Sequence, residues 1–168
     1  MIKKSFIAGM LLHLPLSATA DIHITLEATL IRQPCTLTAE DGKNTLAINF
    51  QDVEINKFSQ AKKDFNILIK KCDLKKNFKI YLLPKDGGTL NINNETVLAT
   101  STEGLGIRFS QKNKTSAVNL QQWEAISPAI IGSSAKFTLQ SQLVTQKPVE
   151  ELEDGPFKAA LSVMVDYI

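Results

Sequence analysis

The sequence contains little of what most catalytic and metal centres require. Of its 168 residues only two are histidines, and His13 lies in the apolar N-terminal stretch, which leaves His23. Serine–histidine catalysis, cysteine–histidine catalysis and histidine-ligated zinc sites lose their usual base or ligand when no histidine lies in the folded core. The two cysteines, Cys35 and Cys72, are far from a CxxC spacing. We therefore expect a protein that is not an enzyme and that uses no cofactor and no metal.

The sequence also lacks an apolar run long enough for a membrane span, which requires about eighteen residues. Lys3 and Lys4 precede the apolar run Phe6–Leu16, which is followed by the small residues of Ala18-Thr19-Ala20. A basic start, a short apolar centre and small residues are typical of a secretory signal peptide. We expect residues 1–20 to be removed, and the mature protein to begin near Asp21, outside the cytoplasm and not embedded in a membrane.

The mature chain has almost no net charge. The sequence contains 19 Lys and Arg residues against 17 Asp and Glu residues, and the signal peptide removes only Lys3 and Lys4, so 17 of each sign remain. No basic surface for nucleic acid or anionic lipid is therefore predicted. Without the signal peptide, 168 − 20 = 148 residues are left, which is the size of one domain.

Export to an oxidising compartment predicts that Cys35 and Cys72 form a disulfide. The bridge would close a loop of 38 residues, counting both ends. Loop-closure entropy then gives a stabilisation of about 4 kcal/mol.

Short strands and turns are predicted along the whole mature chain, without a convincing amphipathic helix. The stretch "EDGKN" at residues 40–44 reads as a hairpin turn before the alternating "TLAINF", and "KDGGTL" reads as a second hairpin turn after "FKIYLL". Several short strands in one domain indicate a β-sandwich or a barrel. Further strands are predicted at Asp64–Cys72, Leu105–Ser110, Lys136–Val144 and Phe157–Tyr167.

Both ends of the mature chain carry an apolar strand pattern. The opening "DIHITLEATL" alternates strictly, and no turn follows that would fold it back on the chain. The closing "GPFKAALSVMVDYI" has an unbroken apolar face up to its penultimate residue. A terminal strand of this kind needs a partner to bury it. The apolar positions are Ile22, Ile24, Leu26, Ala28 and Leu30 in the first strand, and Phe157, Ala159, Leu161, Val163, Val165 and Tyr167 in the second.

Three other features have a functional and a structural interpretation. Trp123 could be a platform for a sugar, but a single tryptophan in an all-β domain is expected in the core. The acidic stretch 150–154 could hold calcium or work in acid–base catalysis, but it lacks the spacing of a calcium loop and is expected to be a solvated loop. The lysines around Cys72 could bind an acidic surface and are expected in a solvated turn. They are Lys70, Lys71, Lys75 and Lys76, and the acidic residues are Glu150, Glu151, Glu153 and Asp154.

Several motifs in order resemble the pilus subunits of the chaperone–usher pathway of Gram-negative bacteria. "DFNILIKKC" is similar to the family's Phe-x-Ile-x-Leu-x-x-Cys, with Phe65, Ile67, Ile69 and Cys72 in its places. "VLATSTEGLGIRF" resembles the segment that ends in Gly-x-Gly-Ile, here Gly104, Gly106 and Ile107. Gly155 is fourteenth from the end and Tyr167 is penultimate, as in the family. The resemblance covers the whole mature chain.

The resemblance implies an incomplete immunoglobulin-like β-sandwich that lacks its last strand. Residues 21–31 would form a donor-strand extension and residues 32–168 the pilin domain. The alternating residues of the opening strand would fill the groove of a neighbouring subunit, and the final strand, from Gly155 to Tyr167, would border this chain's own groove. A periplasmic chaperone would hold the groove first, and an outer-membrane usher would then catalyse exchange into a fimbrium on the cell surface.

One residue of the extension departs from the family pattern. Ala28 stands where the family usually has glycine, which would make Leu26 the residue that enters the last groove pocket. The resemblance, to pilins of the type 1 and P pilus kind, predicts a structural fimbrial subunit that contributes to cell adhesion, a minor or adaptor subunit with other pilus subunits as partners. The alternative is an adhesive tip protein that binds a receptor or glycan, although 148 residues leave no room for a separate lectin domain.

Overall fold

The computed structural model describes residues 27, 34–86 and 88–167. The chain divides into two units, Met1–Ile31 and Arg32–Ile168. Of the first unit only Glu27 is described, so the predicted signal peptide and the opening strand lie outside the described residues. Everything below concerns the second unit.

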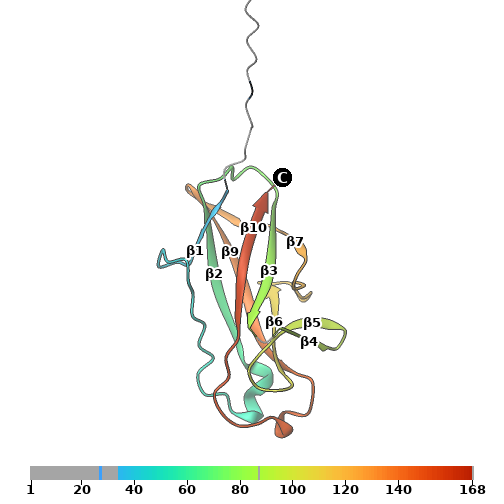
Figure 1. The fold of residues 1–168 in the computed structure, drawn as a ribbon. Helices are drawn as coiled ribbons and strands as arrows, with labels where there is room; N and C mark the ends of the chain where they lie inside the picture. Colours follow the sequence, from blue (N-terminus) through green and yellow to red (C-terminus); the bar gives the residue numbers. More distant parts are fainter. Residues whose placement is uncertain (1–26, 28–33, 87, 168) are drawn as a thin grey trace, which may run out of the picture. The chain divides into compact units, whose positions relative to one another are not determined.

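The described chain forms two antiparallel sheets that enclose one apolar core (Figure 1). The larger sheet has the order β1-β2-β9-β6-β5-β4, and β8 pairs with β9 beside this path. Its strands are β1 (Thr36–Thr38), β2 (Lys62–Lys70), β4 (Thr89–Ile92), β5 (Glu95–Ala99), β6 (Leu105–Gln111), β8 (Ala129–Ile131) and β9 (Ser134–Thr145). The smaller sheet has the order β10-β3-β7, with β3 (Phe78–Asp86), β7 (Trp123–Ile126) and β10 (Ala160–Tyr167). Two short 3-10 helices, η1 (Ile55–Gln60) and η2 (Val149–Glu151), complete the elements of the described residues.

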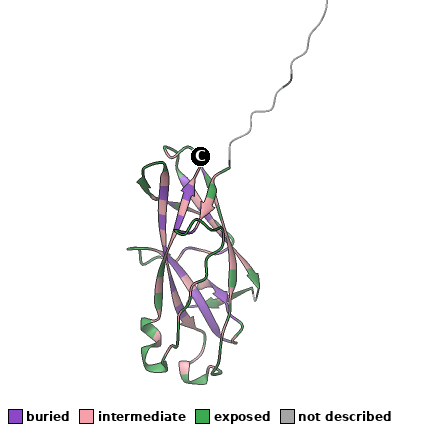
Figure 2. Ribbon diagram, turned by 90° about the vertical axis from the view of Figure 1, so that its left-hand side faces the viewer, coloured by how far each residue is buried: buried purple, intermediate pink, exposed green. Residues whose placement is uncertain are grey.

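The core lies between the sheets because strands of both sheets alternate apolar and polar residues (Figure 2). In β3 the residues at alternate positions are buried, and in β9 every second residue is buried along almost the whole strand. The most deeply buried large side chains are Ile69, Ile80, Leu82, Leu98, Leu139 and Leu143. The expected all-β sandwich is therefore confirmed.

The strands predicted near residues 64–72, 105–110, 136–144 and 157–167 are present as β2, β6, β9 and β10, with ends shifted by a few residues. Two turn predictions are wrong. The "TLAINF" stretch after the turn at residues 39–43 forms no strand, because no neighbouring strand is in reach of its main chain in the described residues. The stretch "KDGGTL" forms no hairpin, because its glycines connect β3 of the smaller sheet to β4 of the larger sheet.

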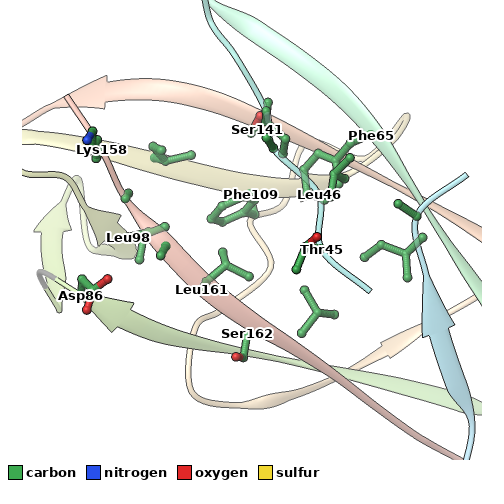
Figure 3. A pocket seen from close by; sticks show the side chains of 18 of the residues that line it. Thr45, Leu46, Phe65, Asp86, Leu98, Phe109, Ser141, Lys158, Leu161 and Ser162 are labelled. Atoms are coloured by element: carbon green, nitrogen blue, oxygen red, sulfur yellow. The ribbon is translucent and has the colours of Figure 1, made fainter. Parts of the chain in front are cut away.

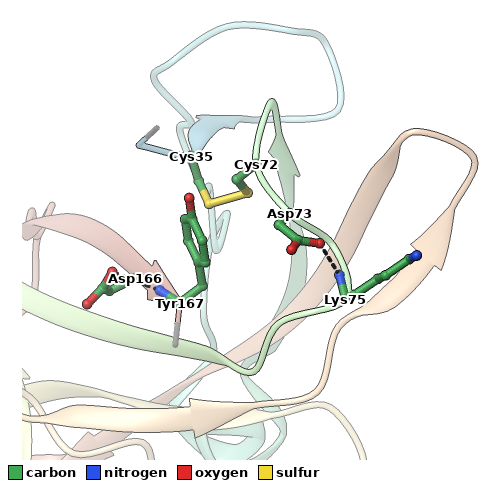
Figure 4. The surroundings of a disulfide bond; sticks show 6 residues. All are labelled: Cys35, Cys72, Asp73, Lys75, Asp166 and Tyr167. Carbon is green, nitrogen blue, oxygen red and sulfur yellow. Dashed lines mark hydrogen bonds between the residues drawn. A yellow bond between two sulfur atoms is a disulfide. The ribbon is translucent and has the colours of Figure 1, made fainter. Parts of the chain in front are cut away.

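The predicted disulfide is present between Cys35 and Cys72, whose Cα atoms are 4.9 Å apart. Cys35 precedes β1 and Cys72 follows β2, and these strands pair with Thr36 opposite Lys70. The disulfide therefore links β1 covalently to β2 directly beside the last residue pair of their hydrogen-bonded ladder. Figure 4 shows the ring of Tyr167 beside the bridge, and this ring lies 6.3 Å from that of Phe78.

Gly106 has a packing role that its motif did not explain. A Cβ atom at this position would lie 2.7 Å from Cγ2 of Val97, a distance that real Cβ atoms do not show. Gly106 pairs with Ala99 of β5 and Val144 of β9, so the absent side chain allows close packing over the sheet. Gly104, two residues earlier, has a φ of 79° at the turn into β6, which glycine adopts without strain.

Candidate functional site

Strand β10 is an edge strand with one unpaired side. It pairs with β3 from Ala160 opposite Asp86 to Tyr167 opposite Phe78. Its other edge has no strand partner in the described part of the chain. An unpaired strand edge presents a row of free N–H and C=O groups that can accept a further strand.

The inward-facing side chains of β10 are only partly covered. Leu161, Val163 and Val165 pack against the core but are half-buried, and Met164 between them points outward and is 40% exposed. The neighbouring strand behaves differently, because its inward residues Ile80 and Leu82 are 0% exposed. The apolar face of β10 is therefore not fully covered by other side chains, whereas that of β3 is.

The wall segment, Asn44–Phe50, lies across from β10. It carries no main-chain hydrogen bond to another element within the described residues. Its apolar side chains alternate at Leu46, Ile48 and Phe50, and Leu46 is 49% exposed. The alternation that predicts a hairpin strand is thus real, but the segment lacks the strand that would pair with it.

The groove is the cavity between β10 and the wall segment, with a volume of about 990 Å³. Figure 3 shows Leu161 and Ser162 on β10 and Thr45 and Leu46 on the wall segment, which all border this cavity. The larger sheet supplies an apolar floor, in which the rings of Phe65 and Phe109 meet edge to face with centroids 6.3 Å apart. Other floor residues are Leu37, Ile67, Leu98 and Ile107.

The predicted groove strand is placed in three groups by the structure. Phe157, Ala159, Leu161 and Val163 line the groove, and Phe157 also meets Phe50 of the wall segment with ring centroids 6.2 Å apart. Val165 packs against the core outside the groove lining, and Tyr167 belongs to the core beside the disulfide. Gly155 is a bend before the strand, with a φ of 141°, and does not line the groove. The side chains of the opening strand that are predicted to fill a neighbour's groove lie outside the described residues; they are Ile22, Ile24, Leu26, Ala28 and Leu30.

Sequence reasoning misses the wall segment but finds part of the floor. Phe65, Ile67 and Ile107 stand out as motif residues, and all three line the groove. Phe109 ends one of the quoted motif segments and lies in a predicted strand, but no role is predicted for it. The alternation of Leu46, Ile48 and Phe50 predicts a hairpin strand; it correctly indicates which side of the segment is apolar, but not that this side borders an unfilled groove.

The prediction that Trp123 lies in the core is wrong. Its side chain is 47% exposed, and its ring lies 5.2 Å from that of Tyr81, with which it is paired in register. Ile80 and Leu82 face the core, so Tyr81 and Trp123 point to the outer face of the smaller sheet. Ile126 is the buried residue of β7, and a position three residues away in a strand faces the other side.

The acidic and basic stretches are exposed, as expected for solvated segments. Glu150, Glu151, Glu153 and Asp154 lie in or just after η2, and Lys71, Lys75 and Lys76 lie between β2 and β3. The prediction is wrong for Lys70, which is the last residue of β2 and is half-buried. No group of side chains suited to a metal ion occurs within the described residues. Likewise, no helix among those residues is long and apolar enough to cross a membrane.

The strongest ion pair of the domain lies away from the groove. Arg108 on β6 donates hydrogen bonds to both carboxylate oxygens of Glu95 on β5 and to the main-chain oxygen of Thr115. The hydrogen bond from Arg108 lowers the pKa of Glu95, and the same bond raises the pKa of Arg108. The pair ties the β4–β5 hairpin to β6, so its role is structural.

Solved structures of pilus subunits have the same fold. The rod subunit PapA of the P pilus superposes with a TM-score of 0.58 at 15% identity, over 81% of this chain and 100% of that one. A chaperone–usher pilus subunit gives a TM-score of 0.60 at 16% identity, over 92% and 99%. The P pilus adaptor subunit PapF gives 0.54 at 18% identity, over 82% and 98%. At these identities the likeness establishes the pilin fold.

No curated protein matches the sequence. The sequence model of the fimbrial protein family, in contrast, matches residues 22–168, which is nearly the whole chain. This family consists of structural pilus proteins of the surface fimbrium and is not an enzyme family. Together with the unfilled groove and the pilin fold, this match establishes that the chain belongs to the fimbrial protein family.

Proposed function

We propose that this fimbrial subunit polymerises by donor-strand complementation, with residues 21–31 as the donor and residues 32–168 as the acceptor domain. The observation that carries the proposal is β10, an edge strand whose inward apolar side chains are half-exposed over a groove of about 990 Å³. A strand added to the free edge of β10 would complete both the main-chain ladder and the core.

The opening strand of the chain has the length and pattern that the groove requires. Asp21–Leu30 places apolar side chains on one face at every second residue, as β10 does on the other side of the groove. Burial of Ile22, Ile24, Leu26 and Leu30 would contribute roughly 6 to 12 kcal/mol as an upper bound, before the ladder hydrogen bonds are counted. This burial would be the main apolar contribution to holding one subunit on the next.

The same features support a need for escort before assembly. An apolar edge strand that is left open pairs with other chains and aggregates. A periplasmic chaperone that lends a strand to the groove, and an outer-membrane usher that exchanges it for the donor of a neighbour, are the partners that fit an exported subunit of this family. The extension itself has to stay accessible until a neighbour's groove receives it.

The proposal is tested by removing the donor and leaving the acceptor intact. A mature chain without residues 21–28 is expected to fold with the chaperone, to exchange it for a synthetic peptide of residues 21–34, and to be unable to add to the groove of a wild-type subunit. Heat-sensitive, detergent-resistant complexes on gels measure the addition. A truncated chain that still adds to wild-type subunits would show that the donor assignment is wrong.

A second candidate function, receptor binding, is favoured by the exposed aromatic surface of Tyr81 and Trp123. Met164, which is 40% exposed, lies opposite Tyr81 in the register of the sheet and extends this surface. Exposed aromatic faces of this kind are suited to stacking on sugars or to packing on a protein receptor. Pili with Trp123→Ala would then assemble normally and lose adhesion to cells, whereas unchanged adhesion would exclude this surface as the receptor site.

A further inference from the structure

The direction of donor addition determines which ends of two subunits meet. The first described residue of the domain, Pro34, lies next to Cys35, at the end of the sandwich where β10 finishes (Figures 1 and 4). A donor antiparallel to the neighbour's β10 places the disulfide end of one subunit against the opposite end of the next. This contact is heterologous and repeats indefinitely, as a fibre requires, whereas a parallel donor would bring two disulfide ends together and favour a closed pair.

The length of the connecting chain keeps the two ends close together. The groove is lined on β10 from Phe157 to Val163, and a donor whose Leu30 lies at the Phe157 end would cover it with the residues that precede Leu30. If Leu30 lies at the Phe157 end of the groove, only the steps from Leu30 to Pro34 remain as a linker. Four steps reach at most about 14 Å, so the disulfide end of one subunit lies within about that distance of the groove end of the next.

The disulfide end carries unpaired positive charge. Residues 70–77, the last residue of β2 and the connection to β3, contain four lysines and one carboxylate, Asp73, which accepts a hydrogen bond of 3.0 Å from the main-chain nitrogen of Lys75 (Figure 4). Its formal charge over residues 70–77 is therefore 4 − 1 = +3. Among the described residues none of these lysines is part of a salt bridge; they are Lys70, Lys71, Lys75 and Lys76.

The opposite end carries unpaired negative charge. η2 and the chain after it lie at the end of the sandwich away from the C-terminus, beside η1 (Figure 1). The four carboxylates of residues 150–154 are exposed and form no salt bridge within the described residues. Lys147 and Lys158 flank them, so residues 147–158 have a formal charge of −4 + 2 = −2. Lys57 of η1 is already paired with Glu54 at 2.9 Å.

We infer that the disulfide end of one subunit docks on the η2 end of a second copy of this chain, with Lys75 and Lys76 facing Glu150 and Glu151. The inference rests on the donor-strand function proposed above and adds the partner. The neighbour of this subunit in the fibre is a second copy of the same chain. The opposite charges attract the incoming subunit while its donor searches for the groove, so they act on the rate of addition. The donor strand then supplies the permanent hold.

Charge reversal at each end tests the contact. Lys75→Glu/Lys76→Glu changes only the disulfide end, and Glu150→Lys/Glu151→Lys changes only the η2 end. Each double variant is expected to form homopolymers about tenfold more slowly than the wild type at low salt, since steering by complementary charge accelerates association by factors of ten or more. The fourfold variant again presents opposite charges at its two ends, and its rate is expected to return to that of the wild type.

The control is Lys43→Glu/Lys114→Glu, which makes the same change in net charge in two exposed loops outside both ends. Its rate is expected to remain that of the wild type. The difference between the variants and the wild type is expected to shrink as salt is raised above about 0.15 M, where exposed charges are screened beyond about 8 Å.

Binding of the peptide of residues 21–34 separates this inference from the function on which it rests. The peptide lacks the domain ends, so it is expected to bind all five proteins with equal affinity. Equal peptide binding with equal polymerisation rates, or a fourfold variant as slow as the double variants, would overturn the end-to-end contact alone. A peptide that does not bind the wild-type subunit would overturn the donor-strand function and the contact together.

Discussion

A carboxylate at position 163 is expected to block the groove, whereas one at position 164 is not. Val163 faces the groove from the middle of β10, is half-buried, and lies opposite Leu82 in the register with β3. Met164, the next residue, points to the outer face and is 40% exposed. The substitutions Val163→Asp and Met164→Asp therefore place the same charge on the same strand, one inside the groove and one outside.

The size of the effect follows from what a bound donor strand would cover. Covering Val163 completely contributes part of the 1.5 to 3 kcal/mol that a buried valine is worth, or roughly 1 kcal/mol, and this is lost in the variant. A carboxylate enclosed between the donor side chains adds a cost of at least about 2 kcal/mol. The total of about 3 kcal/mol or more corresponds to at least about a hundredfold weaker binding of the donor.

The assay is the dissociation constant of the peptide of residues 21–34 for each refolded subunit, together with the unfolding free energy of the free subunit. In the free subunit the introduced carboxylate would still reach water through the open groove, so Val163→Asp is expected to lower the unfolding free energy much less than it lowers peptide affinity. Met164→Asp is expected to change neither by more than about 0.5 kcal/mol, as is usual at exposed positions. Equal peptide affinity of the two variants would refute the assignment of β10 as the acceptor strand.

Three further predictions concern the domain that carries the groove. Cys35→Ser is expected to lower the unfolding free energy by about 4 kcal/mol through loss of the 38-residue closed loop, measured by denaturant unfolding; an unchanged midpoint would show that the bridge is dispensable. Gly106→Ala is expected to cost about 1 to 3 kcal/mol, since its Cβ would lie 2.7 Å from Val97 and both strands would have to shift; a neutral Gly106→Ala would mean that the sheet adapts freely. The folded-state pKa of Glu95 is lowered by Arg108, so this pair stabilises the fold above the unfolded pKa of about 4.3 and its contribution is lost as the pH falls through the lower folded pKa. Because Glu95 is partly exposed, Glu95→Gln is expected to cost no more than about 1 kcal/mol at pH 7 and less at pH 3, and an equal cost at both pH values would contradict the pairing.

The sequence carries enough information for the strands whose apolar face is buried by the chain's own core. The alternation of Phe65, Ile67 and Ile69 locates β2, and the core that determines this pattern is supplied by the chain itself. The odd-numbered apolar residues up to Tyr167 locate β10 as well, but part of this face, at Leu161 and Val163, lines the groove and is half-buried. The disulfide is predicted in the same way, because the chain has two cysteines with one available pairing and a sequence start typical of exported proteins.

The remaining errors have two physical causes. An alternating pattern indicates which side of a segment is apolar, but not whether a neighbouring strand is present. Leu46, Ile48 and Phe50 therefore predict a hairpin strand, although they border an unfilled groove. Turn residues report a change of direction but not the sheet that the chain enters next, so the glycines after Asp86 suggest a hairpin when they cross between sheets. Ile126 lies three residues after Trp123 in the edge strand β7, so the two side chains face opposite sides of the sheet. Because Ile126 is apolar and is buried, it was the available signal that Trp123 faces outward.

The central claim is that the free edge of β10 accepts the opening strand of this same chain, and main-chain hydrogen exchange measures this directly. The amides of Ala160–Tyr167 are followed in the refolded subunit, alone and saturated with the peptide of residues 21–34. Every second amide of β10 bonds to β3, the amide of Tyr167 donates to the Asp166 carboxylate, and the remaining amides face the free edge. The account predicts that the peptide slows exchange of this second set by at least about a hundredfold, with the wall segment protected as well. Peptide binding that leaves exchange along β10 unchanged would contradict the account.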